Sequence, residues 1–382
     1  MVTINGNLKT ASDTVRAARR IVIKVGSSLL MEPNTNEVNK EWLKSLATDI
    51  KHLIDAGKQV VIVSSGAVAL GIERIGLERA KAKVPQLQAA ASIGQIILMR
   101  AYADTLARHD LFVSQVLLTL DAIDDRRRYI NSLNTLNYLL EVGAIPIVNE
   151  NDTTATAELR YGDNDRLAAR VAQMVSADVL ILLSNVNGLY RSFDGSIDEK
   201  SIIPVVEKVT EATMVMASSK KSPHGSGGMK TKLEAASIAT ESGCVMIICD
   251  GRSNNPIDLL LNDGLCTWFK AEESPVSAKK QWILNSPTIN GVITIDDGAV
   301  EALMLGNSLL AIGIIDVQGT FGKGETISIV NAKGDEIARG LCTYACHEII
   351  SVAGKQSDQM IDIIGYYGPD EIVHRDNMAL VQ

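Results

Sequence analysis

Short runs of β-branched and aliphatic residues alternate with amphipathic stretches along the chain as far as Cys249. The short runs predict buried β-strands, and apolar residues repeated at helical spacing predict α-helices. The predicted strands are the run from Ile21 to Gly26 and then Val60–Val63, Phe112–Leu118, Ala144–Val148, Val179–Leu183 and Val245–Cys249. The predicted helices are Glu37–Ala56, Lys81–His109, Asn131–Glu141, the pattern from Leu167 to Val175, and Met229–Glu241.

This alternation predicts an α/β fold in which an open, mostly parallel sheet is sandwiched by helices. We expect Val245–Cys249 to be the strand that closes the sheet. The helix Lys81–His109 has small residues on several faces, among them Ala90 and Gly94, which suit close packing against another helix or a second subunit.

The pattern changes after a polar stretch that contains Pro275 and Pro287. Beyond it, short alternating runs with glycine turns predict a small β-rich, barrel-like module, with strands at Ile312–Val317, Thr326–Val330 and Glu336–Thr343. The first residues carry arginines but no apolar segment, which favours a ragged lead into the first strand over a transit peptide. We therefore predict an N-terminal extension (1–18), a main domain (19–270), a linker (271–290), a β-rich domain (291–370) and a tail (371–382).

Composition and charge exclude several classes of protein. No apolar run approaches the ~18 residues of a membrane span, so we expect a cytoplasmic protein without membrane contact. The five cysteines are expected to be free thiols that act as small buried hydrophobic residues, and we predict no metal site. Residues 291–382 carry 13 acidic and 5 basic side chains, whereas residues 1–290 carry 32 of each. An acidic module repels phosphates, which disfavours nucleic-acid binding.

Lys24 interrupts the first predicted strand, which Gly26, Ser27 and Ser28 close. Burying a lysine is costly unless it faces an anion, and a loop of small residues offers free backbone N–H groups, so this strand end is a candidate phosphate site. The alternative is a Lys24 that reaches solvent at the edge of the sheet. A second small-residue turn, Ser64–Ala67, follows the next strand, and ligands of open α/β sheets bind outside such strand ends.

Two polar clusters and a glycine-rich loop complete the candidate site. Asn149–Asp152 follow a predicted strand, and Gly162–Asp165 precede a predicted helix. Helix capping would explain one of these polar residues, but two such clusters favour a binding site. The loop Ala217–Met229 leads to Lys230 and Lys232 at a helix start, which predicts a second phosphate site or, alternatively, a mobile basic surface loop. Neither loop matches G-x-x-x-x-G-K-[ST] or G-x-G-x-x-G, so the common nucleotide folds are disfavoured.

Five motifs in a fixed order resemble the amino acid kinase superfamily, in the form that phosphorylates glutamate and carries a C-terminal PUA domain. They are Lys24–Ser28, Ser64–Ala67, Asn149–Asp152, Gly162–Asp165 and Gly225–Lys232. The resemblance covers nearly the whole chain from about residue 19. It implies transfer of a phosphoryl group from ATP to the γ-carboxylate of L-glutamate, which is the first step of proline biosynthesis.

The resemblance also implies roles for individual residues. Lys24 and Lys232 would neutralise the phosphates, and Asp165 would hold the two lysines in place. Ser65, Asp152 and Asn164 would bind glutamate. ATP would contact both lysines and a larger set of loop residues: Gly26, Ser27, Ser184, Asn185, Ser226, Gly227, Gly228, Met229, Lys230 and Thr231. The family usually has Thr-Asp where this chain has Ser184 and Asn185, and this change bears on nucleotide affinity rather than on the chemical step.

The residue types of the motifs suit this reaction. A carboxylate with a pKa near ~4.3 is ionised at neutral pH, so the nucleophile needs no general base. The difficulty is to bring this anion against a triphosphate, and lysines, loop amides and Mg²⁺ overcome it. Two adjacent lysines repel each other, so an acid between them has a clear physical purpose.

Other functions stay open at this point. A related kinase would act on acetylglutamate, aspartate, carbamate or uridylate, but an acceptor without a free amine would leave Asp152 unpaired. The second alternative is an RNA-binding protein, because PUA modules elsewhere recognise RNA. The resemblance further implies feedback inhibition by proline, a γ-glutamyl phosphate reductase as partner, and a homo-oligomer, either a dimer or a tetramer.

Overall fold

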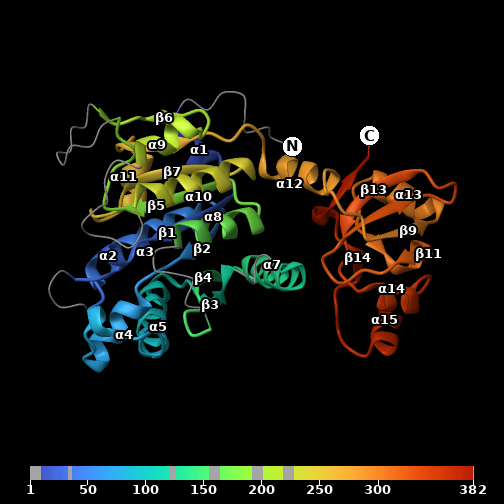
Figure 1. The fold of residues 1–382 in the computed structure, drawn as a ribbon, viewed down its shortest axis with the longest axis horizontal. Coiled ribbons are helices and arrows are strands. Elements are labelled where there is room, and N and C mark those ends of the chain that lie inside the picture. Colours follow the sequence, from blue (N-terminus) through green and yellow to red (C-terminus); the bar gives the residue numbers. More distant parts are fainter. Residues whose placement is uncertain are drawn as a thin grey trace. The chain divides into compact units, whose positions relative to one another are not determined.

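The structure is a computed structural model that describes residues 10–32, 37–120, 125–154, 164–191, 201–217 and 228–381. The chain forms two compact units (Figure 1). The large unit comprises residues 1–122 and 135–275, and the small unit comprises residues 123–134 and 276–382. Each unit has its own hydrophobic core.

An eight-stranded sheet forms the centre of the large unit, in the order β3-β4-β2-β1-β5-β7-β8-β6. The pairing of β7 with β8 is antiparallel, and the other pairings are parallel. The strands are β1 Arg20–Val25, β2 Gln59–Val63, β3 Val113–Leu118, β4 Ile145–Glu150, β5 Val179–Ser184, β6 Val205–Val206, β7 Val245–Asp250 and β8 Cys266–Phe269. The predicted open, mostly parallel sheet is confirmed.

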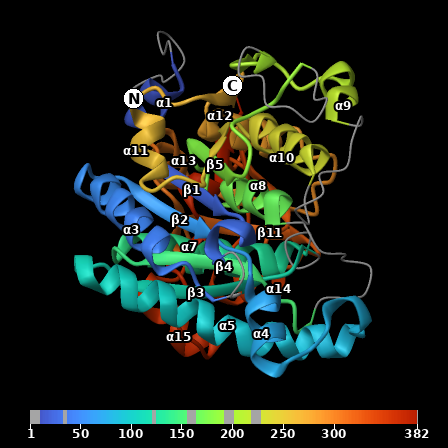
Figure 2. The ribbon, with the colours of Figure 1, turned by 90° about the vertical axis from the view of Figure 1, so that its left-hand side faces the viewer.

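Helices cover both faces of this sheet, and Figure 2 shows α3 on one side with α8 and α10 on the other. The helices of the large unit are α1 Ala11–Ala17, α2 Ser27–Leu30, α3 Lys40–Asp55, α4 Ala67–Ile75, α5 Val84–Leu106, α8 Asn164–Met174, α9 Glu211–Ala217, α10 Met229–Glu241 and α11 Pro256–Leu261. The helix α7 Arg126–Glu141 begins in the small unit and ends in the large one. Two 3₁₀ turns, η1 Arg79–Lys81 and η2 Ala107–His109, flank α5. The Asn39 side chain caps α3 by accepting a hydrogen bond from the backbone N–H of Trp42.

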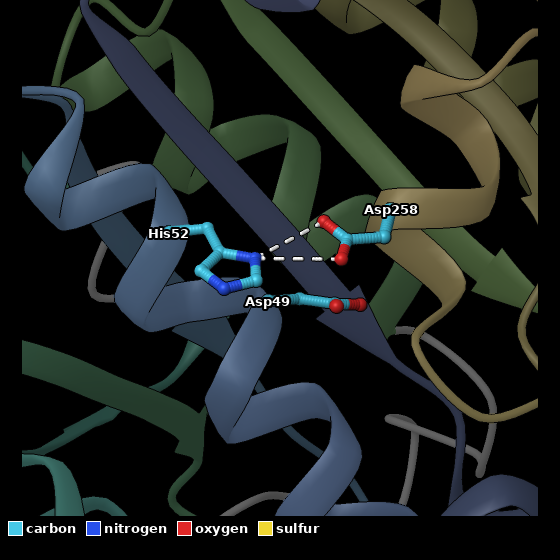
Figure 3. A group of neighbouring side chains, drawn as sticks. All are labelled: Asp49, His52 and Asp258. Carbon is cyan, nitrogen blue, oxygen red and sulfur yellow. Dashed lines mark hydrogen bonds and ion pairs between the residues drawn. The ribbon is translucent and has the colours of Figure 1, made fainter.

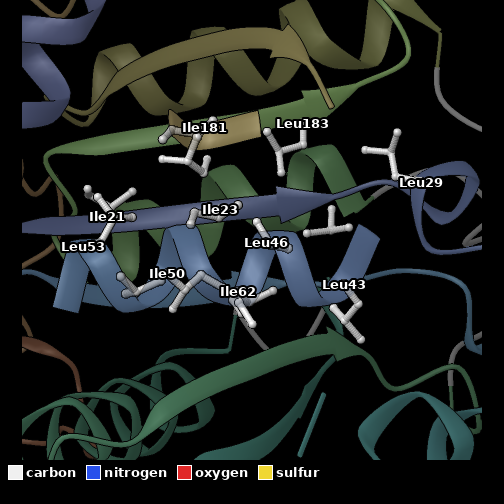
Figure 4. Close-up of a cluster of buried hydrophobic side chains, with 14 of the residues drawn as sticks. Ile21, Ile23, Leu29, Leu43, Leu46, Ile50, Leu53, Ile62, Ile181 and Leu183 are labelled. Atoms are coloured by element: carbon white, nitrogen blue, oxygen red, sulfur yellow. The ribbon is translucent and has the colours of Figure 1, made fainter. Parts of the chain in front are cut away.

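The core between β1 and α3 decides where Lys24 points. Ile21 and Ile23 of β1 pack in one cluster with Leu46 and Ile50 of α3 (Figure 4). Successive side chains of a strand point to opposite faces of the sheet. Lys24 therefore faces away from this cluster, toward the side of the sheet that carries α8 and α10.

Two details of the large unit differ from the sequence-based expectations. Val245–Cys249 does not close the sheet, because β7 pairs with β8, and β8 pairs in turn with β6. Both missed strands are very short, with four and two residues, and so carry little periodic signal. The lead into β1 is not ragged either: α1 is a helix that Thr10 caps and that buries Val15.

The small unit is built on a five-stranded sheet in the order β11-β9-β12-β13-β15, beside a two-stranded sheet of β10 and β14. Its strands are β9 Gly291–Ile295, β10 Leu309–Leu310, β11 Ile314–Gly319, β12 Thr326–Val330, β13 Glu336–Leu341, β14 Glu371–Val373 and β15 Met378–Leu380. Its helical segments are α12 Pro275–Leu284, α13 Asp297–Met304, η4 Ala311–Gly313, α14 Cys346–Val352, α15 Ser357–Ile364 and η5 Arg375–Asn377.

The ends of this unit hold more regular structure than the sequence suggested. Residues 371–382 were expected to be a tail, but β14 and β15 lie within them, and β15 pairs with β13 through Ala338, Arg339 and Gly340. Residues 271–290 were expected to be a linker, and α12 occupies much of this stretch.

Two findings bear on the compositional expectations. Within the described part of the chain, no helix is long and apolar enough to cross a membrane. All five cysteines are free thiols, and four of them are buried, whereas Cys266 is partly exposed.

Candidate active site

Three of the predicted motifs lie at the ends of β1, β2 and β4, which are neighbours in the sheet. Of the other two motifs, Gly162, Asp163 and residues 225–227 lie outside the described residues. β4, β2, β1 and β5 lie side by side and parallel, so their carboxyl ends share one edge of the sheet. The loops that follow β1 and β2 are in contact at this edge. A Cβ atom added to Gly66 would lie only 3.8 Å from Cβ of Ser27. Gly66 has φ +105°, a backbone conformation that favours glycine, and α4 starts directly after it.

A buried ion cluster of Lys24, Asp165 and Lys232, here called the lysine cluster, lies at this edge. The Oδ1 atom of Asp165 lies 2.6 Å from Nζ of Lys24, and its Oδ2 atom lies 2.8 Å from Nζ of Lys232. The three side chains are 11%, 1% and 9% exposed in the order of the sequence. They come from β1, the first turn of α8 and the first turn of α10. With both lysines charged, the cluster carries one excess positive charge, which suits an anionic ligand.

The electrostatics of the lysine cluster keep its acid ionised. Burial raises the pKa of Asp165, but Lys24 and Lys232 together outweigh burial and hold the pKa below its usual range. Burial lowers the pKa of Lys24, an effect that Asp165 opposes and that Lys232 strengthens. Removing Asp165 would thus leave two buried cations without their counter-ion.

The first turn of α10 also contacts Asp165, through Thr231. The hydroxyl of Thr231 is 3.3 Å from Oδ2 of Asp165 and 2.9 Å from the carbonyl oxygen of Gly228, which caps the helix. Met229 is partly buried, whereas Lys230 is exposed, and its Nζ atom lies 3.9 Å from Oε1 of Glu234. The predicted ATP-binding residues Ser226 and Gly227 lie outside the described residues.

Further predicted ATP-binding residues line the end of β5 and the loop after β1. A Cβ on Gly26 would lie 3.9 Å from Nζ of Lys24 and 3.8 Å from the carbonyl oxygen of Leu183. Ser184, the last residue of β5, is buried, and its hydroxyl donates to Oδ1 of Asn185 at 3.4 Å. The loop after β1 therefore runs between the Lys24 ammonium and the end of β5.

A second group, here called the amide cluster, consists of Gln95, Asn149 and Asn164 with the serine turn Ser64–Ser65. The Nδ2 atom of Asn164 donates to the carbonyl oxygen of Ser64 and to Oγ of Ser65, each at 2.7 Å, and to Oδ1 of Asn149 at 3.1 Å. The Nδ2 atom of Asn149 donates to Oε1 of Gln95 at 2.8 Å. Asn164 directly precedes Asp165, so one peptide bond joins the amide cluster to the lysine cluster.

Asp152 follows β4 and is the third residue predicted to bind glutamate. Its carboxylate has no hydrogen bond or ion pair with any residue that the structure describes, and it is partly buried. Burial raises its pKa to about 6. A partly buried acid without a cationic partner is a suitable acceptor for a ligand ammonium group.

The sequence did not identify Gln95 as a member of this site. The only available signal was its place directly after Gly94, in the small-residue stretch of α5. That stretch packs against α4, as the first of the two alternatives predicted: a Cβ on Gly94 would lie 1.8 Å from the carbonyl oxygen of Ala67. This approach brings Gln95 next to the turn from which α4 starts.

One further group of metal-ligating residue types lies elsewhere, between α3 and α11 (Figure 3). Potential ligand atoms of Asp49, His52 and Asp258 lie within 4.8 Å of one another. However, Asp49 already accepts hydrogen bonds from Nδ2 of Asn255 at 3.0 Å and from the backbone N–H of Ile257 at 2.8 Å. These bonds satisfy a buried carboxylate at the start of α11, so we interpret Asp49 as a helix-capping residue.

Comparison with known proteins agrees with this fold. Residues 19–250 match the model of the amino acid kinase family, and residues 291–364 match that of the PUA domain. The protein is thus an amino acid kinase with a PUA domain.

Its similarity to curated proteins narrows the family. The chain is 47% identical to "Glutamate 5-kinase" of Rhodopseudomonas palustris (strain BisB18) over 362 residues, which are 95% of this chain and 96% of the relative. It is 45% identical to the protein of the same name from Paramagnetospirillum magneticum, over 95% of this chain and 98% of that one. The corresponding Bradyrhizobium sp. protein is also 45% identical, over 97% of this chain and 98% of that one. The chain belongs to the glutamate 5-kinase family.

Proposed function

We propose that this chain transfers the γ-phosphoryl group of ATP to the γ-carboxylate of L-glutamate, giving γ-glutamyl phosphate and ADP. The observation that carries this proposal is the buried Asp165 carboxylate between Nζ of Lys24 and Nζ of Lys232, at 2.6 and 2.8 Å. Two buried ammonium groups held by one acid suit a reaction in which a phosphoryl group passes between two anions. The family relationship supports the same activity.

In this mechanism the chain's own residues act mainly by position and charge. The glutamate carboxylate attacks the γ-phosphorus of ATP, the bond to the bridging oxygen breaks, and ADP leaves with that electron pair. Lys24 and Lys232 stabilise the negative charge that spreads over the phosphoryl oxygens. Asp165 keeps both ammonium groups at fixed positions, and the loops at Gly26 and Gly228 contribute backbone N–H groups.

Mg²⁺ would bind in this site together with the nucleotide. Both oxygens of Asp165 are engaged by lysines, so this acid is not available as a metal ligand. Mg²⁺ commonly keeps several water ligands and binds through substrate phosphates. The phosphates of ATP would therefore hold the ion, which would supply further neutralisation of their negative charge.

Glutamate would bind on the side of the amide cluster. Ser65, Asn164 and Asp152 offer a hydroxyl, an amide and a carboxylate, which are suitable partners for the charged groups of an amino acid. The Asp152 carboxylate distinguishes a free amine from an acetylated one, because the acetylated acceptor would leave this acid buried without a partner. This selection favours glutamate over acetylglutamate or uridylate.

The proposal extends to the physiological setting. The product is a labile acyl phosphate, the first intermediate of proline biosynthesis, which a γ-glutamyl phosphate reductase would consume. Proline would inhibit as the end product, and the protein would be a homo-oligomer. Mass photometry, and glutamate titrations with and without proline, test the last two points.

An acceptor panel tests the proposed activity. ATP and Mg²⁺ are supplied with glutamate, acetylglutamate, aspartate, carbamate or uridylate, and hydroxylamine traps any acyl phosphate as the hydroxamate. We expect γ-glutamyl hydroxamate and ADP in equal amounts with glutamate. ADP release with uridylate or acetylglutamate, and none with glutamate, would refute the proposal.

A further inference from the structure

The hydrogen bonds of the amide cluster have a direction that the backbone fixes. The backbone N–H of Glu150 donates to Oδ1 of Asn149 at 2.9 Å, so this oxygen cannot exchange places with the amide nitrogen. Asn149 must therefore turn its Nδ2 toward Gln95, which has to receive it with Oε1. At the other end, the carbonyl oxygen of Ser64 can only accept, so Asn164 must present Nδ2 to it.

This direction determines what the cluster offers to a ligand. The two hydrogens of Asn164 Nδ2 are shared among three acceptors, on Ser64, Ser65 and Asn149, whereas its Oδ1 atom has no partner among the described residues. Because Oγ of Ser65 accepts from Asn164, the Ser65 hydroxyl hydrogen remains available for donation. The pair thus presents one acceptor and one donor, which suits the ammonium and carboxylate groups of an amino acid.

Gln95 accepts a hydrogen bond from Asn149 with Oε1, but its amide nitrogen Nε2 makes no hydrogen bond with a described residue. Only 8% of the residue is exposed, and its buried Nε2 atom has no partner among the described residues. A buried unpaired donor is unfavourable, so a residue needed for packing alone would be better served by an apolar side chain. The use of an amide here is explained by Oε1, which satisfies and orients Asn149.

The helix that carries Gln95 supports the serine turn at a second point. Tyr102 lies two turns further along α5, on the same face, and its hydroxyl is 3.1 Å from Oγ of Ser64. Both Tyr102 and Ser64 are fully buried. The α5 helix thus contacts the serine turn directly through Tyr102. It also acts on the turn indirectly, because Gln95 bonds to Asn149, which bonds to Asn164.

From these contacts we infer that Gln95 is a positioning residue of the acceptor site, which acts through Asn149 to fix the polarity of Asn164 and Ser65. This inference rests on the proposed function for the identity of the acceptor. Gln95 does not touch the reacting atoms, and it belongs to the amide cluster rather than to the lysine cluster. Its loss should therefore weaken acceptor binding and leave ATP binding unchanged.

Three variants of the full chain test this inference. Gln95→Met keeps the length of the side chain but removes Oε1, whereas Gln95→Glu keeps an acceptor for Asn149. The control is Thr105→Val, which removes a buried hydroxyl from the same helix about 15 Å from Gln95. For Gln95→Met we expect the acceptor KM to rise about tenfold, with kcat and the ATP KM within about twofold, as for the loss of one buried hydrogen bond. Gln95→Glu should restore the acceptor KM to within about threefold of wild type. Thr105→Val should leave all three constants unchanged.

The outcomes separate this inference from the proposed function. If wild-type protein phosphorylates another member of the acceptor panel instead of glutamate, the proposed function fails, and the variants are compared on that acceptor. A folded Gln95→Met with an unchanged acceptor KM would overturn the inference. So would a rise in acceptor KM and ATP KM together that follows a fall in Tm, since that is the sign of a structural role alone. If Gln95→Met is insoluble, Gln95→Glu decides alone. A folded Gln95→Glu with a tenfold higher acceptor KM would overturn the inference, because this variant keeps the acceptor for Asn149.

Discussion

The lysine cluster and the amide cluster meet at the peptide bond between Asn164 and Asp165, yet they bind in different ways. Asp165 holds two ammonium groups by charge, at 2.6 and 2.8 Å. Asn164 joins a serine turn and another amide by hydrogen bonds of fixed direction, with no formal charge. Charge acts in all directions and is strong in a buried site, whereas an amide distinguishes donors from acceptors.

This difference separates two tasks in the proposed reaction. Charge that stabilises the transferring phosphoryl group acts in the transition state and appears in kcat. Directional hydrogen bonds to glutamate act already in the ground state and appear in KM. Variants of the two clusters should therefore change different kinetic constants.

The largest expected effect comes from the lysine cluster. Lys232→Met keeps the side-chain length and removes the charge, so kcat should fall at least about a hundredfold while the glutamate KM changes little. Hydroxamate formation measured over a range of glutamate concentrations provides both constants. Lys208→Met, a change at an exposed lysine paired with Glu272, is the matched control. An unchanged kcat with a higher glutamate KM would instead assign Lys232 to the acceptor site.

Asp152→Asn should give a smaller effect of a different kind. Removing the acid that we assign to the substrate amine should raise the glutamate KM by about tenfold or more, with ATP affinity unchanged. It should also stabilise the ligand-free protein. Because burial raises the pKa of Asp152 from 3.8 to about 6, its ionised form costs stability on the order of 3 kcal/mol at pH 7.

This cost depends on pH in a defined way. The folded protein binds the proton more tightly than the unfolded chain, so the penalty is absent below the unfolded pKa of 3.8 and complete above about 6. Asp152→Asn should raise Tm at pH 7 and leave it unchanged near pH 4. A lower Tm at pH 7 would mean that Asp152 has a stabilising partner.

The smallest effect is expected from pH alone. A substrate ammonium group pairs with ionised Asp152, whose pKa is about 6 in the free protein. The glutamate KM should therefore be constant above about pH 7 and rise below pH 6, at most to the value of Asp152→Asn, because protonation also leaves this side chain uncharged. In Asp152→Asn this dependence should vanish. If the variant retains it, another group titrates in the acceptor site.

The same comparison shows what the sequence could predict. Lys24 was recognisable because a lysine within an apolar strand needs an anion, and the strand ends that carry Ser64 and Asn149 were recognisable by their periodicity. Gln95 was not, since an amide on a helix looks the same in a sequence whether it is exposed or buried. Its contact with Asn149 spans 54 residues and depends on the close approach of α5 to α4. The strands β6 and β8 escaped prediction because pairing, rather than a long periodic pattern, defines them.

The most direct test of the account uses the two neighbouring residues Asn164 and Asp165. The variants Asn164→Leu and Asp165→Asn change adjacent side chains of similar size, one in each cluster, and kcat and KM are measured for both. We expect Asp165→Asn mainly to lower kcat, and Asn164→Leu mainly to raise the glutamate KM. If both variants change the same constant to the same extent, the division of the site into a charged transfer half and a neutral acceptor half is contradicted.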